Sequence, residues 1–272
     1  MTTERSRCRF AIIGLGRIGK RILQRLPGTS HAPDLAGILV REDAREAAES
    51  LVGAERVFTR LQDLVATRPD VVVECAGAAA LTEFGPAVLA SGADLMPLSL
   101  AALADPGFEA TIMAAAAAGH GRLDIVAGAM GSLEFLAAAR EDRLDDVLFR
   151  AAYPPMRWRD TPAEAMIDLD RATAPAVFLS TSVREAVRLF PRHINVAVGV
   201  ALAGLGLDRT RCELLADPAL TQATFEIQAF AGPGPVRLTV AGRGAPLGAD
   251  PVDYTTFTVI HRLRRRRATV MV

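Results

Sequence analysis

Three glycines near the beginning of the chain have a spacing that suits phosphate binding. Gly14, Gly16 and Gly19 form G-x-G-x-x-G in the segment GLGRIG, which closes an apolar run. In this pattern the first glycine permits a tight turn, the second lets backbone amides approach a pyrophosphate, and the third lets a helix pack closely on a strand. The helix N-terminus adds N–H donors and partial positive charge. The spacing predicts a dinucleotide-binding loop that includes Arg17 and Ile18; the alternative is a glycine-rich turn without a ligand.

A histidine and an asparagine stand two residues apart at the beginning of a small-residue apolar segment, in RHINVAVGVALAG. An imidazole can hold or release a proton near neutral pH. We therefore interpret His193 as a candidate acid–base group and Asn195 as a candidate for orienting a substrate. The alternative is that His193 only bonds to backbone at a helix start. His31, His120 and His261 have no metal-ligand spacing, so we expect no metal site.

The first half of the chain alternates short β-branched runs with helical segments. Such alternation predicts an α/β fold with a doubly wound parallel sheet of the Rossmann type. A sheet buried on both faces needs strands that are apolar throughout, as CRFAIIGLG is. We expect strands at 8–16, 35–40, 70–77, 94–100 and 122–130, and helices at 17–26, 44–52, 81–92 and 108–121.

The pattern changes from about Leu144. Segments such as DDVLFRAAYPP and ATFEIQAFAG alternate polar and apolar residues, which predicts a second, α+β domain with an open mixed sheet. Ser182 and Glu185 have the spacing of a capping box and predict a helix start. We expect a dinucleotide-binding domain at 1–130 and a substrate-binding and dimerisation domain at 131–250. Residues 251–272 are expected to pack back on the first domain, with a helix at 253–263.

The tips of the other expected strands complete the cofactor prediction. Arg41 follows the second strand, where an arginine can accept the 2′-phosphate of NADP and a carboxylate favours NAD. Because Arg41 comes first at this strand tip, we expect NADP, or the use of both NADP and NAD, as the cofactor. The alternative is that Arg41 only points into solvent and contacts no cofactor. Small residues after later strands let backbone approach the nicotinamide end. These further cofactor candidates are Cys75, Ala76, Gly77, Ser99 and Leu100, with Cys75 interpreted as a packing residue rather than a nucleophile.

Composition excludes several classes of partner. The 272 residues carry a formal net charge of zero, which gives no general attraction to nucleic acid or an anionic membrane. Three cysteines make no disulfide framework, and with no long apolar run we expect a cytoplasmic protein. One basic run, HRLRRRR at 261–267, is interpreted as a solvated helix end or as a phosphate-binding tail.

With these segments in view, the chain resembles the L-aspartate dehydrogenase family along nearly its whole length. The most specific segment is FPRHINVAVGVALAG, similar to a family pattern Phe/Tyr-Pro-Lys-Asn-x-Asn-Val-Ala. The resemblance implies oxidative deamination of L-aspartate through iminosuccinate, or the reverse reaction with ammonia. It also implies a Rossmann domain, a second domain with substrate contacts, and a homodimer. The segments that carry it are GLGRIG, VVECAG, LSLAALADPG, VAGAMGSLEFLAAAR, DTPAEA, SVREAVRLFPRHINVAVGVALAGLGLD and LLADP.

Four parts of the chain depart from the family pattern, and one of them is His193, where the family has asparagine. The family's catalytic histidine, one strand after LLADP, is matched here by Phe225, and a family lysine on the strand before Trp158 is matched by Tyr153. A family turn Asn-Pro-Lys-Thr-Ser is matched by Asp250 to Tyr254. The resemblance thus makes Tyr153, Trp158 and Phe225 the candidate substrate-binding residues.

Three functions remain open. The first is an NAD(P)-dependent oxidoreductase acting on the CH–NH₂ group of an amino acid or on an imine, with a small amino acid, 2-oxo acid or imine as substrate. The second is a diverged imine reductase for a substrate other than aspartate, and the third a non-catalytic nucleotide-binding dimer. A sugar or polyol dehydrogenase is disfavoured because SLAALA holds no acid–base lysine.

Overall fold

A computed structural model describes residues 7–27, 32–232, 234–241 and 254–268. His31 and positions 250–253 lie outside the described residues. The chain divides into two compact units, Met1–Gly128 with Thr255–Val272, and Ala129–Tyr254. Each unit is described by itself.

The first unit is built on a parallel sheet of five strands in the order β3-β2-β1-β4-β5. This order and the parallel pairing confirm the Rossmann-type fold predicted from the alternating segments. The strands are β1 (Arg9–Ile13), β2 (Asp34–Leu39), β3 (Val57–Phe58), β4 (Val71–Glu74) and β5 (Asp94–Pro97). The helices are α1 (Arg17–Arg25), α2 (Arg45–Val52), α3 (Leu61–Ala66), α4 (Ala78–Ala90), α5 (Pro106–Ala118) and α9 (Tyr254–Arg265).

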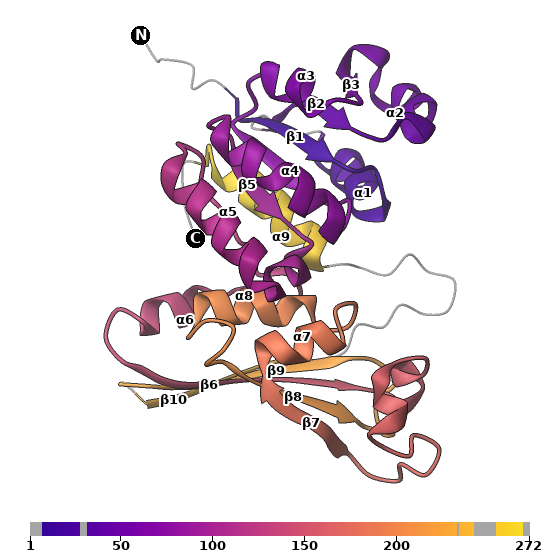
Figure 1. The fold of residues 1–272 in the computed structure, drawn as a ribbon, viewed down its shortest axis with the longest axis vertical. Coiled ribbons are helices and arrows are strands. Elements are labelled where there is room, and N and C mark those ends of the chain that lie inside the picture. Colours follow the sequence, from indigo (N-terminus) through magenta and orange to yellow (C-terminus); the bar gives the residue numbers. More distant parts are fainter. Residues whose placement is uncertain (1–6, 28–31, 233, 242–253, 269–272) are drawn as a thin grey trace. The chain divides into compact units, whose positions relative to one another are not determined.

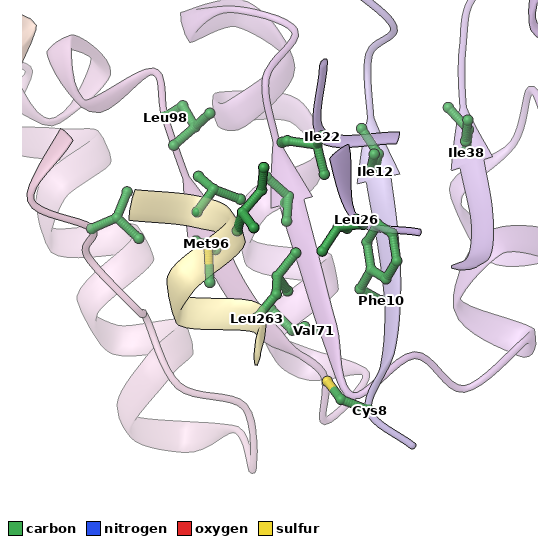
Figure 2. Packing of buried hydrophobic residues seen from close by; sticks show 14 of the residues in the cluster. Cys8, Phe10, Ile12, Ile22, Leu26, Ile38, Val71, Met96, Leu98 and Leu263 are labelled. Atoms are coloured by element: carbon green, nitrogen blue, oxygen red, sulfur yellow. The ribbon is translucent and has the colours of Figure 1, made fainter. Parts of the chain in front are cut away.

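The core of the first unit holds apolar side chains from both faces of this sheet. On one face Phe10 and Ile12 of β1 pack with Ile22 of α1 and with Leu263 of α9 (Figure 2). The helix expected near the end of the chain is present as α9, and Val259, Ile260 and Leu263 of this helix lie in the core. In Figure 1, α4 and α5 lie on the opposite face of the sheet from α1 and α9.

The strand expected at 122–130 was a wrong prediction. Only Leu123 forms a bridge, to Leu95 at the edge of β5. Gly128 has φ +52°, a left-handed conformation that an extended strand does not adopt, and it begins a short helical turn. The sheet therefore ends at β5.

The second unit is an open sheet in the order β10-β9-β6-β8-β7. β6 and β8 are parallel and the other pairs antiparallel, which confirms the mixed sheet. The strands are β6 (Leu144–Tyr153), β7 (Ala176–Ser182), β8 (Arg211–Ala216), β9 (Thr224–Ala231) and β10 (Gly234–Val240). The helices α6 (Glu134–Ala139), α7 (Val183–Leu189) and α8 (Asn195–Ala203) lie on one face of it (Figure 1). α7 begins as predicted, because Ser182 Oγ accepts a hydrogen bond from the N–H of Glu185 at 3.3 Å.

Candidate functional site

The glycine loop, residues 14–19, joins β1 to α1. Its three glycines differ in whether the surrounding atoms leave room for a side chain. A Cβ at Gly14 (φ +89°) would lie 2.7 Å from the Cβ of Ala76, and one at Gly19 would lie 2.9 Å from the carbonyl oxygen of Gly14. Packing of the loop therefore requires both glycines. A Cβ at Gly16 would meet nothing within 4 Å. Gly16 thus leaves open room at the N-terminus of α1, where the predicted pyrophosphate needs it.

The N-terminus of α1 fits an anionic ligand. Gly16 is the N-cap and provides no side-chain cap, and the first turn contains no acidic residue. Its N–H groups and the positive end of the helix dipole therefore suit a phosphate. Arg17 is exposed at the first helical position, and Ile18 is half-buried behind it.

A buried carboxylate holds the two loops that follow β4 and β5. Glu74 is fully buried, and its Oε1 accepts hydrogen bonds from the N–H groups of Ala76 (2.7 Å) and Gly77 (2.9 Å). Ser99 donates from its hydroxyl to Oε1 (3.0 Å) and from its N–H to Oε2 (3.1 Å). Four donors therefore compensate the buried charge. Glu74 was not predicted as a site residue, although a carboxylate at the end of the apolar run DVVVE was a signal.

Cys75 and Leu100 pack rather than present reactive side chains. Burial raises the pKa of the Cys75 thiol to about 12, and the negative charge of Glu74 is the second cause. Its Sγ lies 3.3 Å from the carbonyl oxygen of Gly14 and a Cβ at Gly19 would touch it, so it fits the packing interpretation. Leu100 is 4% exposed, so a ligand could contact its backbone but not its side chain.

Arg41 lies just beyond the end of β2, where the sequence placed it. Its guanidinium donates to Asp43 Oδ2 at 2.9 Å, and the side chain is 86% exposed. An exposed pair of this kind contributes little to stability. Arg41 can therefore turn to a ligand at small cost.

In the second unit, four predicted residues form one cluster at the edge of the sheet where β6 and β8 end. We call Tyr153, Trp158, His193 and Phe225 the aromatic cluster. The hydroxyl of Tyr153 donates to the carbonyl oxygen of His193 at 2.6 Å, and the two rings meet edge-on at 5.7 Å. Trp158 is fully buried, donates from Nε1 to the carbonyl oxygen of Leu215 at 2.9 Å, and stacks on His193 at 5.0 Å. Trp158 therefore fixes the histidine ring.

The contacts of His193 also indicate which of its ring nitrogens carries the proton in the neutral form. Its Nε2 lies 3.0 Å from the carbonyl oxygen of Arg157, which only accepts, so Nε2 carries the proton and Nδ1 is the acceptor of the neutral ring. Burial, and after it the charges of Arg157 and Arg192, lower the pKa of His193 below its usual 6.5, although the bond to the Arg157 carbonyl opposes them. His193 is half-buried, and the lowered pKa favours the neutral form of its imidazole.

Phe225 completes the cluster on the other side of Tyr153. It is 6% exposed, stacks on Phe149 at 5.9 Å and meets Tyr153 edge-on at 5.9 Å. Phenylalanine cannot exchange a proton, so this side of Tyr153 is apolar. Asn195 begins α8 and is half-buried two residues beyond His193.

In 7–27, 32–232, 234–241 and 254–268, no three His, Cys, Asp or Glu side chains are grouped as metal ligands would be. In the same ranges no helix combines the length and the apolar character that crossing a membrane requires.

The glycine loop at the uncapped start of α1, on a parallel sheet in the order β3-β2-β1-β4-β5 and followed by a mixed-sheet unit, is typical of the class of NAD(P)-dependent oxidoreductases. The model of the homoserine dehydrogenase NAD-binding domain matches residues 14–125, and that of the aspartate dehydrogenase C-terminal domain matches residues 134–266. The chain is 37% identical over 270 residues to an L-aspartate dehydrogenase of Cupriavidus necator, covering 96% of this chain and 98% of that protein. An L-aspartate dehydrogenase of Pseudomonas aeruginosa is 36% identical, covering 93% and 96%. The chain belongs to the L-aspartate dehydrogenase family.

Solved structures show the same fold. An aspartate dehydrogenase from Thermotoga maritima superposes with a TM-score of 0.74 at 21% identity, covering 98% of this chain and 100% of that one. A hyperthermophilic archaeal homoserine dehydrogenase in complex with NADPH gives a TM-score of 0.55 at 13% identity, covering 95% and 97%. The fold class and the resemblance inferred from the sequence are confirmed. The chain is an NAD(P)-dependent oxidoreductase of the aspartate dehydrogenase type.

Proposed function

We propose that this chain interconverts the CH–NH₂ group of an amino acid and the corresponding imine, with L-aspartate as the first candidate substrate. The single observation that carries this proposal is the position of the His193 imidazole, which stacks on Trp158 and places its Nε2 3.0 Å from the Arg157 carbonyl oxygen. Full-length relatives named L-aspartate dehydrogenase support the substrate class. The first unit would bind the nucleotide and the second the substrate.

The residues of the first unit fit the cofactor. Gly16, Arg17 and the N-terminus of α1 would hold the pyrophosphate, and the backbone of Gly77 and Ser99 would lie beside the nicotinamide end. When bound, the nicotinamide accepts or supplies the hydride. Arg41 would contact the 2′-phosphate of NADP.

His193 would move the proton that amine oxidation requires. A substrate ammonium must lose a proton before its carbon can give up a hydride, and Nδ1 of a neutral imidazole can accept that proton. Asn195 would orient the substrate from the first residue of α8. Trp158 is a positioning residue, because its ring is fully buried and its N–H is bonded to Leu215.

Phe225 favours a second candidate, an imine with a less polar side chain than that of aspartate. The family position of the catalytic histidine is here part of an apolar stack with Phe149. A carboxylate beside that stack would lose hydration without gaining a donor from it. A cyclic or secondary imine that is already formed also needs less proton transfer.

One assay separates the candidates. Purified protein is mixed with NADPH or NADH and with oxaloacetate plus ammonia, beside a panel of imines and other 2-oxo acids with ammonia. Turnover with oxaloacetate supports aspartate chemistry, whereas turnover with other imines only supports the second candidate. Nucleotide binding without turnover of any substrate would refute both and support a non-catalytic protein.

Variants test the assigned proton carrier. His193→Asn introduces the residue of the family pattern and should lower turnover while leaving the Kd of the nucleotide unchanged. Full turnover in His193→Asn would remove His193 from the mechanism. Leu189→Asn, at an exposed position on α7, is the matched control and should leave turnover unchanged.

A homodimer in the cytoplasm completes the proposal. The face of the second sheet opposite α6, α7 and α8 carries the partly exposed Phe230 and Val177, 48% and 49% exposed. Sedimentation of Phe230→Glu against the wild type tests whether this face joins two copies. The free cysteines Cys8, Cys75 and Cys212 support a reducing compartment.

A further inference from the structure

The first unit contains a charged cavity at the edge of the sheet where its strands begin. The cavity has a volume of about 720 Å³ and lies beside Cys8 before β1, Asp70 before β4 and Asp94 at the start of β5. In a parallel sheet all strands begin at one edge, and the glycine loop follows the opposite, carboxyl end of β1. The cavity is therefore distinct from the dinucleotide site.

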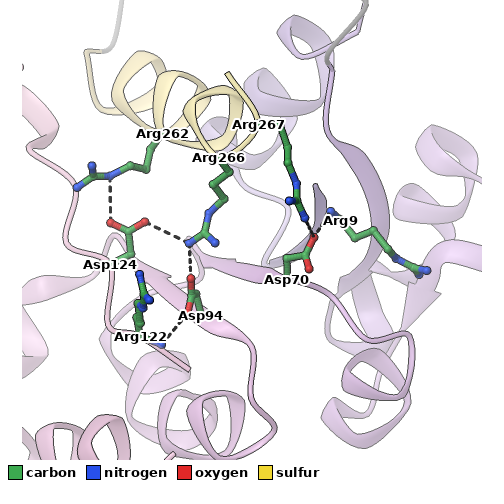
Figure 3. A network of polar contacts seen from close by, with 8 residues as sticks. All are labelled: Arg9, Asp70, Asp94, Arg122, Asp124, Arg262, Arg266 and Arg267. Carbon is green, nitrogen blue, oxygen red and sulfur yellow. Dashed lines mark hydrogen bonds and ion pairs between the residues drawn. The ribbon is translucent and has the colours of Figure 1, made fainter. Parts of the chain in front are cut away.

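Guanidinium groups outnumber carboxylates in this cavity. Five arginines line it against three aspartates, which leaves an excess of two positive charges. The basic run at the end of the chain supplies most of them, from α9 and the two residues beyond its last turn (Figure 3). The arginines are Arg122, Arg262, Arg265, Arg266 and Arg267.

Two of the aspartates hold two of these arginines by ion pairs. Asp94 Oδ2 accepts from Arg266 Nη2 at 2.6 Å, and Asp124 Oδ1 lies 3.0 Å from Arg262 Nε (Figure 3). These carboxylates are thereby neutralised, and the two arginines are held toward the sheet. Their positions are set before any ligand arrives.

Among the described residues, the guanidinium groups of Arg122 and Arg267 form no such close ion pair with these aspartates. Arg122 contacts Asp94 through its backbone N–H at 2.7 Å rather than through its guanidinium, and Arg267 Nη2 lies 3.9 Å from Asp70 Oδ2. Within the described residues, the Nε atoms of Arg266 and Arg267 are buried without a hydrogen-bond partner. Buried donors usually have an acceptor, and an oxyanion bound in the cavity would supply one.

We propose that this arginine cavity binds a small ligand with two or more oxyanion groups. The guanidinium fork matches phosphate and carboxylate oxygens in two-point geometry, and several forks around one cavity favour multiply charged ligands over chloride. The volume is in the range of small-molecule sites, about 300–1,000 Å³. The bound anion joins α9 to the sheet edge and stabilises the first unit by mass action.

The test is calorimetric titration of the full chain with sodium pyrophosphate and, separately, sodium citrate. NADPH is kept saturating so that the glycine loop is occupied, and chloride holds ionic strength constant. We expect saturable binding of at least one anion. Tighter pyrophosphate binding identifies a phosphate ligand, and tighter citrate binding a polycarboxylate.

Substitutions locate the binding. Arg122→Gln and Arg267→Gln should each weaken the anion about tenfold or more, the loss expected for one charged hydrogen bond. Arg60→Gln is the matched control, because it removes the same charge from an exposed position outside the cavity. Unchanged NADPH affinity shows that each variant is folded, and the exposed Arg122 alone suffices if Arg267→Gln unfolds. No saturable binding of either anion, or equal binding by all variants, would overturn the proposal.

Discussion

Replacing Glu74 with glutamine changes one oxygen of a buried carboxylate to an amino group. Three donors converge on Oε1, and one, the N–H of Ser99, on Oε2. With the amide oxygen at the Oε1 position, the new NH₂ group faces the N–H of Ser99. Two donors then oppose each other in a site that water does not reach, since Glu74 is fully buried.

The cost follows from these contacts. A buried donor left without an acceptor costs about 1–3 kcal/mol, and the remaining bonds lose charge assistance. Removal of a buried charge offsets part of that loss, so we expect a fall of about 3 kcal/mol in the free energy of unfolding. At about 2–4 °C per kcal/mol, the Tm should fall by about 6–12 °C. Loops freed beside the cofactor should raise the Kd of NADPH about tenfold.

Differential scanning calorimetry and fluorescence titration with NADPH measure both effects. Ser99→Ala removes only the hydroxyl donor and should show a smaller loss of about 1 kcal/mol. Asp105→Asn is the matched control, because Asp105 only accepts from the N–H of Phe108 at 2.7 Å and an amide oxygen can do the same. If Glu74→Gln matches this control in Tm and Kd, the carboxylate does not position the loops.

Other predictions concern both units. Gly14→Ala should destabilise the chain by about 1–2 kcal/mol or more, because a left-handed residue gains a clashing Cβ, whereas Gly16→Ala should keep the Tm and lose nucleotide affinity in the same titration. Arg41→Ala should raise the Kd of NADP more than that of NAD; equal losses would contradict its role. The acidic limb of kcat/KM should lie below pH 6.5, because the lowered pKa keeps His193 basic until the pH falls through it, and His193→Asn should lack that limb. Phe225→His should raise activity with oxaloacetate plus ammonia, measured against other imines, if the apolar side of the cluster excludes aspartate.

Local patterns in the sequence predicted most of the fold. β1 and β4 are apolar runs buried on both faces, and the Ser182 cap lies next to the helix that it begins. β7 was not predicted, because it pairs only with β8 at the sheet edge and no residue of it is fully buried. Its segment AVFLSTS is an apolar run followed by a polar one, so it lacks the alternation that marks a half-buried strand.

The site was predictable where it depends on one short segment. The glycine loop can be recognised from six consecutive residues, and the backbone conformation of such a loop is enough to explain why it needs glycine. The hydrogen bonds between Glu74 and Ser99 join residues 25 apart, and Asp94 contacts Arg266 across 172 residues. No spacing rule connects such positions. Only the folded chain therefore shows that Glu74 holds the loops after β4 and β5 and that the arginines line one cavity.

Under the proposed function, the aromatic cluster offers a route for proton transfer although position 225, which the resemblance matches to a catalytic histidine, is phenylalanine. His193 and Phe225 both meet the ring of Tyr153 edge-on, at 5.7 and 5.9 Å. A proton carrier at either position therefore serves the same edge of the second sheet. What changes is polarity: the Phe225 side offers no donor, while His193 keeps an acceptor at Nδ1. The reaction class can then be retained while preference among substrate side chains shifts, which makes Phe225 the residue to examine for specificity and His193 the residue to examine for rate.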